Sequence, residues 1–314
     1  LDIDDFLTFL PVRVMAVHRD RLHCMGPSFD GQVQPFIADP DDGGTAGTVG
    51  DWLLLDAITH RPMRLLDRRS LFKRRAAGTD RAVQLIAANV DTLFIVSSCN
   101  QDFNMARLER YLALAREAEV TPVVVLTKAD RAEDVEAFRT QVEAIAPGTR
   151  LFAINAKSAE SCAALAAQLQ PGQTAVLVGS SGAGKSTLTN TLLGSELQAT
   201  GSIRESDGRG RHTTVSRALK PLPGGACLID TPGLREIKLT GDEDLAEAGF
   251  DDIEALAGDC RFRDCRHEKE PGCAVRAAVE RGEVEPARLA SWAKLGGEIA
   301  RAGETAQQRV QRKQ

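Results

Sequence analysis

Residues 179–187 read Gly-Ser-Ser-Gly-Ala-Gly-Lys-Ser-Thr, a glycine-rich run that ends in Lys-Ser-Thr. The apolar run 174–178 precedes it, and a helix-like segment, residues 188–193, follows it. Strand, G-x-x-x-x-G-K-S motif and helix therefore stand in the order that a phosphate-binding loop requires. Glycines let backbone N–H groups converge on an anion, and the next helix presents its positive N-terminal end. The sequence predicts a nucleoside triphosphate site. The alternative is a glycine-rich turn that matches by chance, which the flanking strand and helix disfavour.

Each position of this loop has a predicted role in holding the nucleotide. Lys185 would reach the β- and γ-phosphates, and the Ser186 hydroxyl would bind Mg²⁺. The loop as a whole would surround the phosphates, through residues Gly179, Ser180, Ser181, Gly182, Ala183, Gly184, Lys185, Ser186 and Thr187.

Two segments upstream predict which base the site reads. One apolar run leads into Thr127-Lys128-Ala129-Asp130, and a second leads into Asn155-Ala156-Lys157. Asp130 would accept hydrogen bonds from guanine N1–H and the 2-amino group. Adenine would leave this carboxylate facing a lone pair, which costs more than the about 1–3 kcal/mol of an unpaired neutral group. The stem of Lys128 would lie along the purine, and the backbone of residues 155–157 would meet guanine O6. The predicted substrate is GTP.

An apolar segment downstream ends in the motif D-x-x-G, formed by Asp230 and Gly233. Asp230 would hold Mg²⁺ through water, and the Gly233 N–H would sense the γ-phosphate. Residues 203–215 are polar and show neither the helical nor the strand period, which indicates a mobile loop. Thr213 or Thr214 would complete the Mg²⁺ shell when the γ-phosphate is present, as in an order–disorder switch.

The order of these motifs differs from that of most GTPases, because the base-reading segments come before the phosphate loop. Further motifs accompany this permutation: Gln84-Leu-Ile-Ala-Ala-Asn-Val-Asp91, Asp102-Phe-Asn-Met-Ala-Arg-Leu-Glu-Arg-Tyr111, Gly208-Arg-Gly-Arg-His-Thr-Thr214, Asp230-Thr-Pro-Gly233 and a cysteine cluster at 260–273. With these residues the chain resembles the circularly permuted GTPases, and within them the RsgA (YjeQ/YloQ) family of ribosome small-subunit-dependent GTPases. The similarity covers essentially the whole chain.

Two positions depart from the usual GTPase pattern. Thr127 stands where most GTPases carry Asn, so guanine affinity is expected to be weaker while Asp130 keeps the selectivity. Leu234 follows Gly233, where Ras-like enzymes place the Gln that orients the attacking water. His212 is the best replacement, because a histidine can orient or deprotonate water near neutral pH. The family resemblance points to the same residue, and the alternative is a solvent-facing loop histidine. Slow turnover that rises when a partner orders the loop is expected.

Three cysteines and a histidine gather within fourteen residues near the end of the chain, as Cys260, Cys265, His267 and Cys273. Three thiolates and an imidazole match a closed, tetrahedral structural zinc site. The residues between them are charged and turn-forming, so they cannot build a core unaided. Disulfides are the alternative, and they are disfavoured because neither a signal peptide nor a membrane span is visible. The remaining cysteines are predicted to be buried thiols: Cys24, Cys99, Cys162 and Cys227.

The flanks of the motif-bearing region complete the predicted domain organisation. Residues 11–66 alternate in short segments separated by turn-rich spacers, which indicates a small β-barrel. The family resemblance implies an OB fold there. The predicted architecture is a multidomain α/β protein. It has an OB-fold β-barrel at 1–75, a circularly permuted P-loop GTPase domain with a mostly parallel sheet and flanking helices at 76–240, and a helical zinc-binding domain at 241–314.

Composition limits the classes of partner. Hydrophobic residues make up 43% of the chain and provide ample core, while a net charge of −5 excludes a globally basic RNA binder. Aromatic residues are only 4%, so base-stacking platforms would be few. Cations gather in residues 61–75, which favours a local phosphate-binding patch or, alternatively, a solvated linker.

These observations predict a monomeric cytoplasmic enzyme, without a membrane partner, that converts GTP to GDP and phosphate with Mg²⁺. By resemblance, its partner is the small (30S) ribosomal subunit in late maturation, contacted through 16S rRNA, and the subunit stimulates turnover. One alternative is a nucleotide-gated RNA-binding module that acts on mRNA or tRNA. Another is a permuted GTPase whose barrel and zinc domain dock protein partners.

Overall fold

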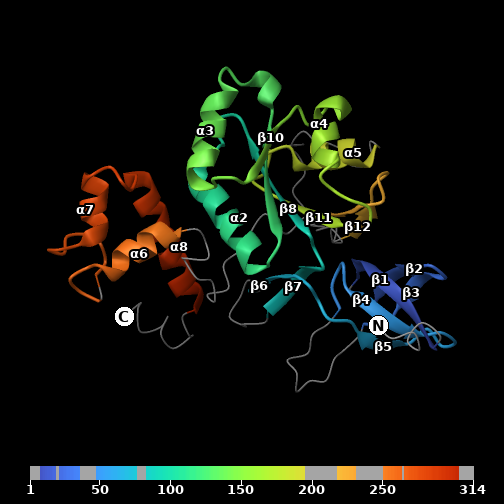
Figure 1. Cartoon of the computed structure of the whole chain (residues 1–314). Coiled ribbons are helices and arrows are strands. Elements are labelled where there is room, and N and C mark those ends of the chain that lie inside the picture. The colour runs from blue at the N-terminus through green and yellow to red at the C-terminus, as the bar shows by residue number, and fades with distance from the viewer. Residues whose placement is uncertain are drawn as a thin grey trace, which may run out of the picture.

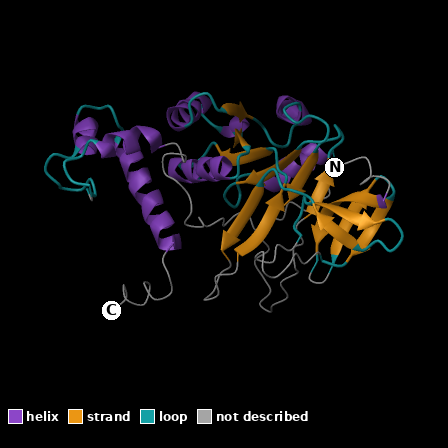
Figure 2. Cartoon of the chain, turned by 60° about the horizontal axis from the view of Figure 1, so that its bottom comes forward, coloured by secondary structure: helices purple, strands orange, loops and turns teal. Residues whose placement is uncertain are grey.

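The computed structural model describes residues 8–18, 21–35, 47–75, 83–194, 218–230, 250–263 and 265–303. A central sheet with helices on both faces lies between an N-terminal antiparallel sheet and a group of C-terminal helices (Figure 1). Figure 2 shows the same arrangement from another side, with the two sets of strands adjoining and the last helices at the opposite end. The three parts therefore follow one another in space as they do in the sequence.

In the part of the chain that the structure describes, the central sheet has five parallel strands in the order β10-β9-β8-β11-β13. β8 and β11 are buried at every position, as expected of apolar runs in a parallel sheet that is covered on both faces. Because the strands are parallel, their carboxyl ends share one edge. The strands are β8 (Thr92–Ser98), β9 (Thr121–Thr127), β10 (Arg150–Ala153), β11 (Thr174–Val178) and β13 (Cys227–Asp230).

Four helices among the described residues cover the two faces of this sheet. Side chains alternate along β8, so Leu93 and Ile95 join the core on one face and Phe94 and Val96 the core on the other. The first face is covered by α2 (Met105–Glu117) and α3 (Val135–Ile145), and the second by α4 (Ala159–Ala166) and α5 (Lys185–Leu193).

The four helices begin in two different ways. Asn104, Asp134 and Ser158 each cap a helix, at the start of α2, α3 and α4, by accepting a backbone N–H with the side chain. Helix α5 begins instead at Gly184, in the left-handed conformation and without a capping side chain. The first N–H groups of α5 are therefore the ones that suit an anion.

The N-terminal sheet is antiparallel, with the strand order β3-β2-β1-β4-β5. Alternate residues face its own small core, formed by Val12, Val14, Leu22, Cys24, Val33, Leu53 and Leu55. The short strands predicted between residues 11 and 66 are therefore present. They are β1 (Phe9–Val17), β2 (Leu22–Gly26), β3 (Phe29–Val33), β4 (Trp52–Asp56) and β5 (Pro62–Leu65).

This sheet is continuous with the central one. Strand β12 (Ala218–Pro221) pairs antiparallel with β13 and also with β1, where Ala16 lies opposite Ala218. Arg13, only 8% exposed, donates from Nη2 to Thr174 Oγ1 at 2.7 Å and to the Asn89 carbonyl at 3.2 Å. A separate hairpin of β6 (Leu71–Arg75) and β7 (Val83–Ala88) lies between the two parts in the sequence.

The C-terminal part consists of α6 (Asp251–Gly258), α7 (Ala274–Glu280) and α8 (Pro286–Gly303). Arg288 on α8 holds Asp252 through two hydrogen bonds of 2.9 Å and lies 3.6 Å from the buried Glu109 carboxylate of α2. Its guanidinium also lies over the ring of Phe250. Helix α8 therefore packs on the α2 side of the central sheet and holds α6 beside it, and α7 packs against α6. Within the described ranges, no helix combines the length and apolar character needed to span a membrane.

Candidate nucleotide site and metal centre

The carboxyl edge of the central sheet brings four predicted segments together. Thr127 ends β9, residues 155–157 follow β10, residues 179–187 follow β11, and Asp230 ends β13. Successive strands extend the sheet in one direction from β8 to β10, and β11 then returns to the other side of β8. In open α/β sheets, the carboxyl-end crevice at such a switch of direction is where ligands bind.

The glycines at the two ends of the loop 179–184 are required by close packing. Gly179 has φ of 145°, and a Cβ there would lie 2.1 Å from the carbonyl oxygen of Val96 on β8. Gly184 has φ of 96°, and a Cβ there would meet the Thr127 hydroxyl at 3.3 Å. Both glycines therefore let the loop lie against its neighbouring strands while it turns into α5.

Lys185 lies back over the loop that precedes it. Its Nζ donates to the carbonyl oxygen of Gly179 at 2.6 Å and to that of Ser180. Ser186 and Thr187 follow in the first turn of α5, and both are half-buried. An ammonium group and helical N–H groups are thus placed around one short loop, as phosphate binding requires.

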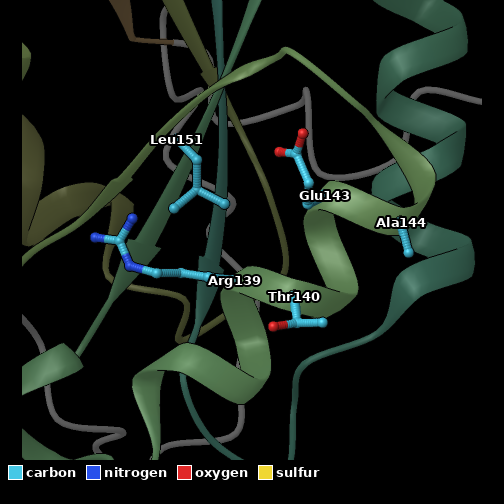
Figure 3. A pocket seen from close by; sticks show the side chains of 5 residues that line it. All are labelled: Arg139, Thr140, Glu143, Ala144 and Leu151. Atoms are coloured by element: carbon cyan, nitrogen blue, oxygen red, sulfur yellow. The ribbon is translucent and has the colours of Figure 1, made fainter.

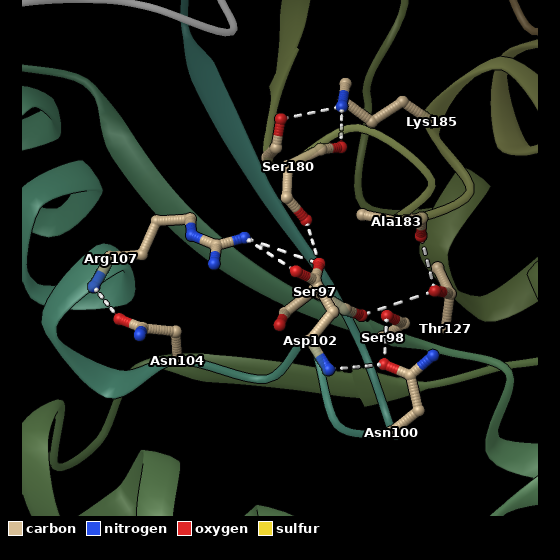
Figure 4. A network of polar contacts seen from close by, with 11 residues as sticks. Ser97, Ser98, Asn100, Asp102, Asn104, Arg107, Thr127, Ser180, Ala183 and Lys185 are labelled. Atoms are coloured by element: carbon tan, nitrogen blue, oxygen red, sulfur yellow. Dashed lines mark hydrogen bonds and ion pairs between the residues drawn. The ribbon is translucent and has the colours of Figure 1, made fainter.

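Thr127 braces the phosphate loop from the neighbouring strand. It is fully buried, and its hydroxyl donates to the carbonyl of Ala183 at 2.6 Å, with the Ser97 carbonyl at 3.3 Å (Figure 4). A hydroxyl carries one donor, which this contact uses. The Thr at this position therefore retains a bracing contact with the loop, and its burial removes it from direct contact with a base.

The base-reading segment after β9 makes a tight turn. Lys128 is in the left-handed conformation, with φ of 57°, and residues 129–131 form a single 3₁₀ turn, η2 (Ala129–Arg131). The Ala129 N–H donates to the Ile154 carbonyl at 3.3 Å, which ties this turn to the end of β10. The Asp130 carboxylate is 41% exposed and lies 4.0 Å from the Arg131 guanidinium.

The second base-reading segment, residues 155–157, is tied to the helix that follows the phosphate loop. Thr191 on α5 donates from its hydroxyl to the carbonyl of Ala156 at 2.6 Å. The Asn155 side chain accepts the Lys157 N–H at 3.0 Å, which closes a turn before α4. The loop that would read the base is thus tied to α5, the helix that begins at the phosphate loop.

Several predicted residues are not placed. Thr214, Gly233 and His212 lie outside the described residues, as does the loop 203–215. The position of Asp230 at the end of β13 is described, and its side chain is not. The roles assigned to these residues stay predictions.

The predicted metal ligands converge in the C-terminal part. One ligand atom from each of Cys260, Cys265, His267 and Cys273 lies within 4.8 Å of all the others. His267 Nδ1 lies 3.3 Å from Cys273 Sγ and 3.6 Å from Cys260 Sγ, and the latter two sulfurs are 3.9 Å apart. A tetrahedral zinc ion, with Zn–S bonds of about 2.3 Å and Zn–N bonds of about 2.0 Å, separates its ligands by about 3.5–3.8 Å. The donor set and its spacing fit zinc.

Two surrounding contacts support such a centre. The Arg276 N–H donates to Cys273 Sγ at 3.4 Å, so this sulfur is held from the first turn of α7. His267 is buried, and the ring of Trp292 packs edge-on against it at 5.1 Å between centroids. The imidazole orientation is therefore fixed by packing.

Sequence reasoning missed one contact at the phosphate loop. Asp102, in the turn between β8 and α2, accepts a hydrogen bond from the Ser180 hydroxyl (Figure 4). This hydrogen bond, together with the Arg107 guanidinium, holds the pKa of Asp102 below its usual range although burial raises it. In the sequence, Asp102 stands only as the first residue of the family-like motif 102–111. Nothing in that motif marks it as a neighbour of the phosphate loop, because this depends on the order of the strands.

A shallow depression elsewhere on the surface does not belong to this site. Figure 3 shows its lining, with Arg139, Thr140, Glu143 and Ala144 on α3 and Leu151 on β10. Leu151 lies toward the amino end of β10, whereas the loops of the nucleotide site leave the carboxyl ends. Nothing on the lining points to a ligand.

Comparisons with known proteins agree with this geometry. A family model described as RsgA GTPase matches residues 65–240, more than half of the chain. The protein called small ribosomal subunit biogenesis GTPase RsgA in Xanthomonas euvesicatoria pv. vesicatoria (strain 85-10) is 57% identical over 263 residues, which is 83% of this chain and 72% of that protein. The chain belongs to the RsgA GTPase family. The protein of the same name in Xanthomonas campestris pv. campestris (strain B100) is equally similar. The chain is therefore a GTP hydrolase, and this activity implies GTP as substrate with Mg²⁺.

Solved structures support the permuted fold. YloQ, described as a circularly permuted GTPase, has a TM-score of 0.64 at 23% identity, covering 95% of this chain and 97% of that one. YjeQ from Thermotoga maritima has a TM-score of 0.65 at 23% identity, with coverage of 95% and 100%. The predicted circularly permuted GTPase fold is confirmed.

Proposed function

We propose that this GTPase acts in the late maturation of the 30S ribosomal subunit and that the subunit stimulates its turnover. The observation that carries the proposal is the meeting of residues 127–130, 155–157 and 179–187 at one edge of the sheet in a permuted order. Relatives at 57% identity are called small ribosomal subunit biogenesis GTPases, which supports the choice of partner. Contact would be made through 16S rRNA by a monomeric, cytoplasmic chain.

The residues of the site take the following roles in the proposal. Lys185 and the backbone of residues 179–187 hold the phosphates, and Asp130 selects guanine. The residues that would hold Mg²⁺ are Ser186 and Asp230, the latter through water, with Thr214 joining when the γ-phosphate is present. Mg²⁺, when bound, neutralises charge on the β- and γ-phosphates. Gly233 would sense the γ-phosphate, and His212 would orient the attacking water.

The domains around the GTPase core also have proposed roles. The N-terminal strands at 1–75 form an OB fold, which the antiparallel order β3-β2-β1-β4-β5 supports. The GTPase domain spans 76–240, and the C-terminal domain, 241–314, is built on a structural zinc ion. Residues 234–241 join the D-x-x-G motif directly to the zinc domain. The nucleotide state could therefore reposition that domain, so that the three domains clamp the subunit with GTP and release it after hydrolysis.

Purified 30S subunits are expected to raise GTP turnover by at least about tenfold, because a partner that places His212 and Thr214 at the nucleotide would complete the catalytic site. Phosphate release is measured with the chain alone, with 30S, with 50S and with protein-free rRNA. Stimulation by 30S alone supports the proposal. Equal stimulation by free RNA would favour a general RNA-binding module, and no stimulation by any particle would favour a protein partner.

Substituting His212→Ala is expected to lower 30S-stimulated turnover by about 10²–10⁴-fold, the usual contribution of a residue that acts on the nucleophile. Binding of GTP is expected to remain, because the phosphate loop and Asp130 are unchanged. His18→Ala, in the N-terminal part, is the matched control. Stimulated turnover that survives in His212→Ala would end the catalytic assignment.

A further inference from the structure

Asp102 occupies the switch point of the central sheet. It lies in the turn after β8, and Ser180 lies in the loop after β11, the strand beside β8. The Asp102 carboxylate accepts the Ser180 hydroxyl, and the Arg107 Nη1 group lies 3.3 and 3.4 Å from its two oxygens. Asp102 is thus held from α2 on one side and contacts the phosphate loop on the other.

The turn that carries Asp102 is itself fixed. The Asn100 side chain accepts the Ser98 hydroxyl at 2.8 Å and the Asp102 N–H at 3.0 Å. Asn104 then caps α2 by accepting the Arg107 N–H at 2.9 Å (Figure 4). These contacts hold the backbone of the turn, and the Arg107 guanidinium holds the Asp102 carboxylate itself, so Asp102 can serve as a rigid support.

Ser180 connects Asp102 to Lys185 through two of its own polar groups. Its hydroxyl is bound by Asp102, while its carbonyl accepts the Lys185 ammonium, which also binds the Gly179 carbonyl at 2.6 Å. The same residue, Ser180, is therefore held by Asp102 at its side chain and holds Lys185 at its carbonyl. Thr127 supports the far end of the loop in the same way, through the Ala183 carbonyl.

We infer that Asp102 is a positioning residue for phosphate binding: through Ser180 it fixes the loop and the Lys185 ammonium for the β- and γ-phosphates of GTP. The inference deepens the proposed function and rests on it, because it requires that residues 179–187 bind phosphates.

The direction in which an Asp102 substitution changes nucleotide affinity distinguishes two roles for this carboxylate. A carboxylate near a phosphate site repels the anion, so simple electrostatics predicts that neutralising Asp102 tightens binding. A positioning role predicts the opposite.

The test measures the Kd of GDP and of a non-hydrolysable GTP analogue for the full chain by fluorescence. Asp102→Ala is expected to weaken both by about tenfold, the cost of one charge-assisted hydrogen bond. Asp102→Asn, which keeps an acceptor oxygen, is expected to recover part of the loss. Ser180→Ala is expected to raise the Kd as much as Asp102→Ala does. The double variant is expected to bind within about twofold of either single variant, because both substitutions remove the same contact.

Glu283→Ala is the matched control, since it also removes a carboxylate that is hydrogen-bonded to an arginine, here Arg281 in the C-terminal part. Its nucleotide affinity is expected to equal that of the unchanged chain. Equal loss in Glu283→Ala, full additivity in the double variant, or unchanged or tighter binding in Asp102→Ala would each overturn the inference. The variant Lys185→Ala distinguishes failure of the proposed phosphate loop from failure of the inference about Asp102. If it binds GDP normally, the proposed phosphate loop fails and the inference with it. If it loses GDP while Asp102→Ala does not, only the inference fails.

Discussion

Removal of zinc by a chelator is expected to unfold the C-terminal helices while the central sheet stays folded and keeps binding GDP. The predicted ligands span residues 260–273, a segment of charged turns between α6 and α7 that a bound metal would hold in place. In zinc-finger peptides the apparent free energy of zinc binding is about 10–16 kcal/mol, which exceeds what a small lobe's core supplies. Circular dichroism and limited proteolysis at residues 250–303, with and without chelator, measure the effect.

Two single substitutions test whether the cysteine cluster is the source of this dependence. Cys273→Ser is expected to lose the ion and make the lobe sensitive to protease even without chelator. Cys227→Ser, on β13 and outside the cluster, is expected to retain one zinc per chain by elemental analysis. A purified chain that contains no zinc and yet resists protease in the lobe would show that the cluster is a set of packed thiols.

Motifs whose chemistry is local could be predicted from the sequence. The phosphate loop is an example, because the backbone conformation of the loop requires glycines and these glycines can be read directly in the sequence. Thr127 and Asn155 could be assigned to one site because each follows an apolar run, and parallel strands place their carboxyl ends at one edge. The cysteine cluster was equally clear, since its four ligands lie within fourteen residues.

Contacts between distant segments could not be predicted in the same way. The pairing of β1 with β12, and the hydrogen bond from Arg13 to Thr174 across 161 residues, depend on tertiary placement that no periodicity encodes. The same holds for Arg288 and Glu109, which join α8 to α2. Asp102 belongs to this class, because a lone acidic residue in a turn has no distinguishing pattern until the strand order is known.

The substitution Asp130→Asn is expected to lower GTP affinity by about a hundredfold or more and to make xanthosine triphosphate the preferred nucleotide. The carboxylate offers two acceptors to guanine N1–H and its 2-amino group, and an amide replaces one of them with a donor. That donor would face the 2-amino group of guanine, and a site left with such a mismatch rejects its ligand strongly. Xanthine carries a carbonyl at that position, so the amide donor regains a partner.

The geometry of the turn after β9 makes this expectation specific to Asp130. The 3₁₀ turn at 129–131 is tied to β10 through the Ile154 carbonyl, so the substituted side chain keeps its direction. Competition of GTP, xanthosine triphosphate and ATP against a fluorescent GDP measures the preference. Asp134→Asn is the matched control, because Asp134 caps α3 and Asn caps a helix about equally well. If Asp130→Asn kept its preference for GTP, or if the unchanged chain bound ATP as tightly as GTP, Asp130 would not be the residue that reads the base. The nucleotide would then have to lie against other groups at this edge of the sheet.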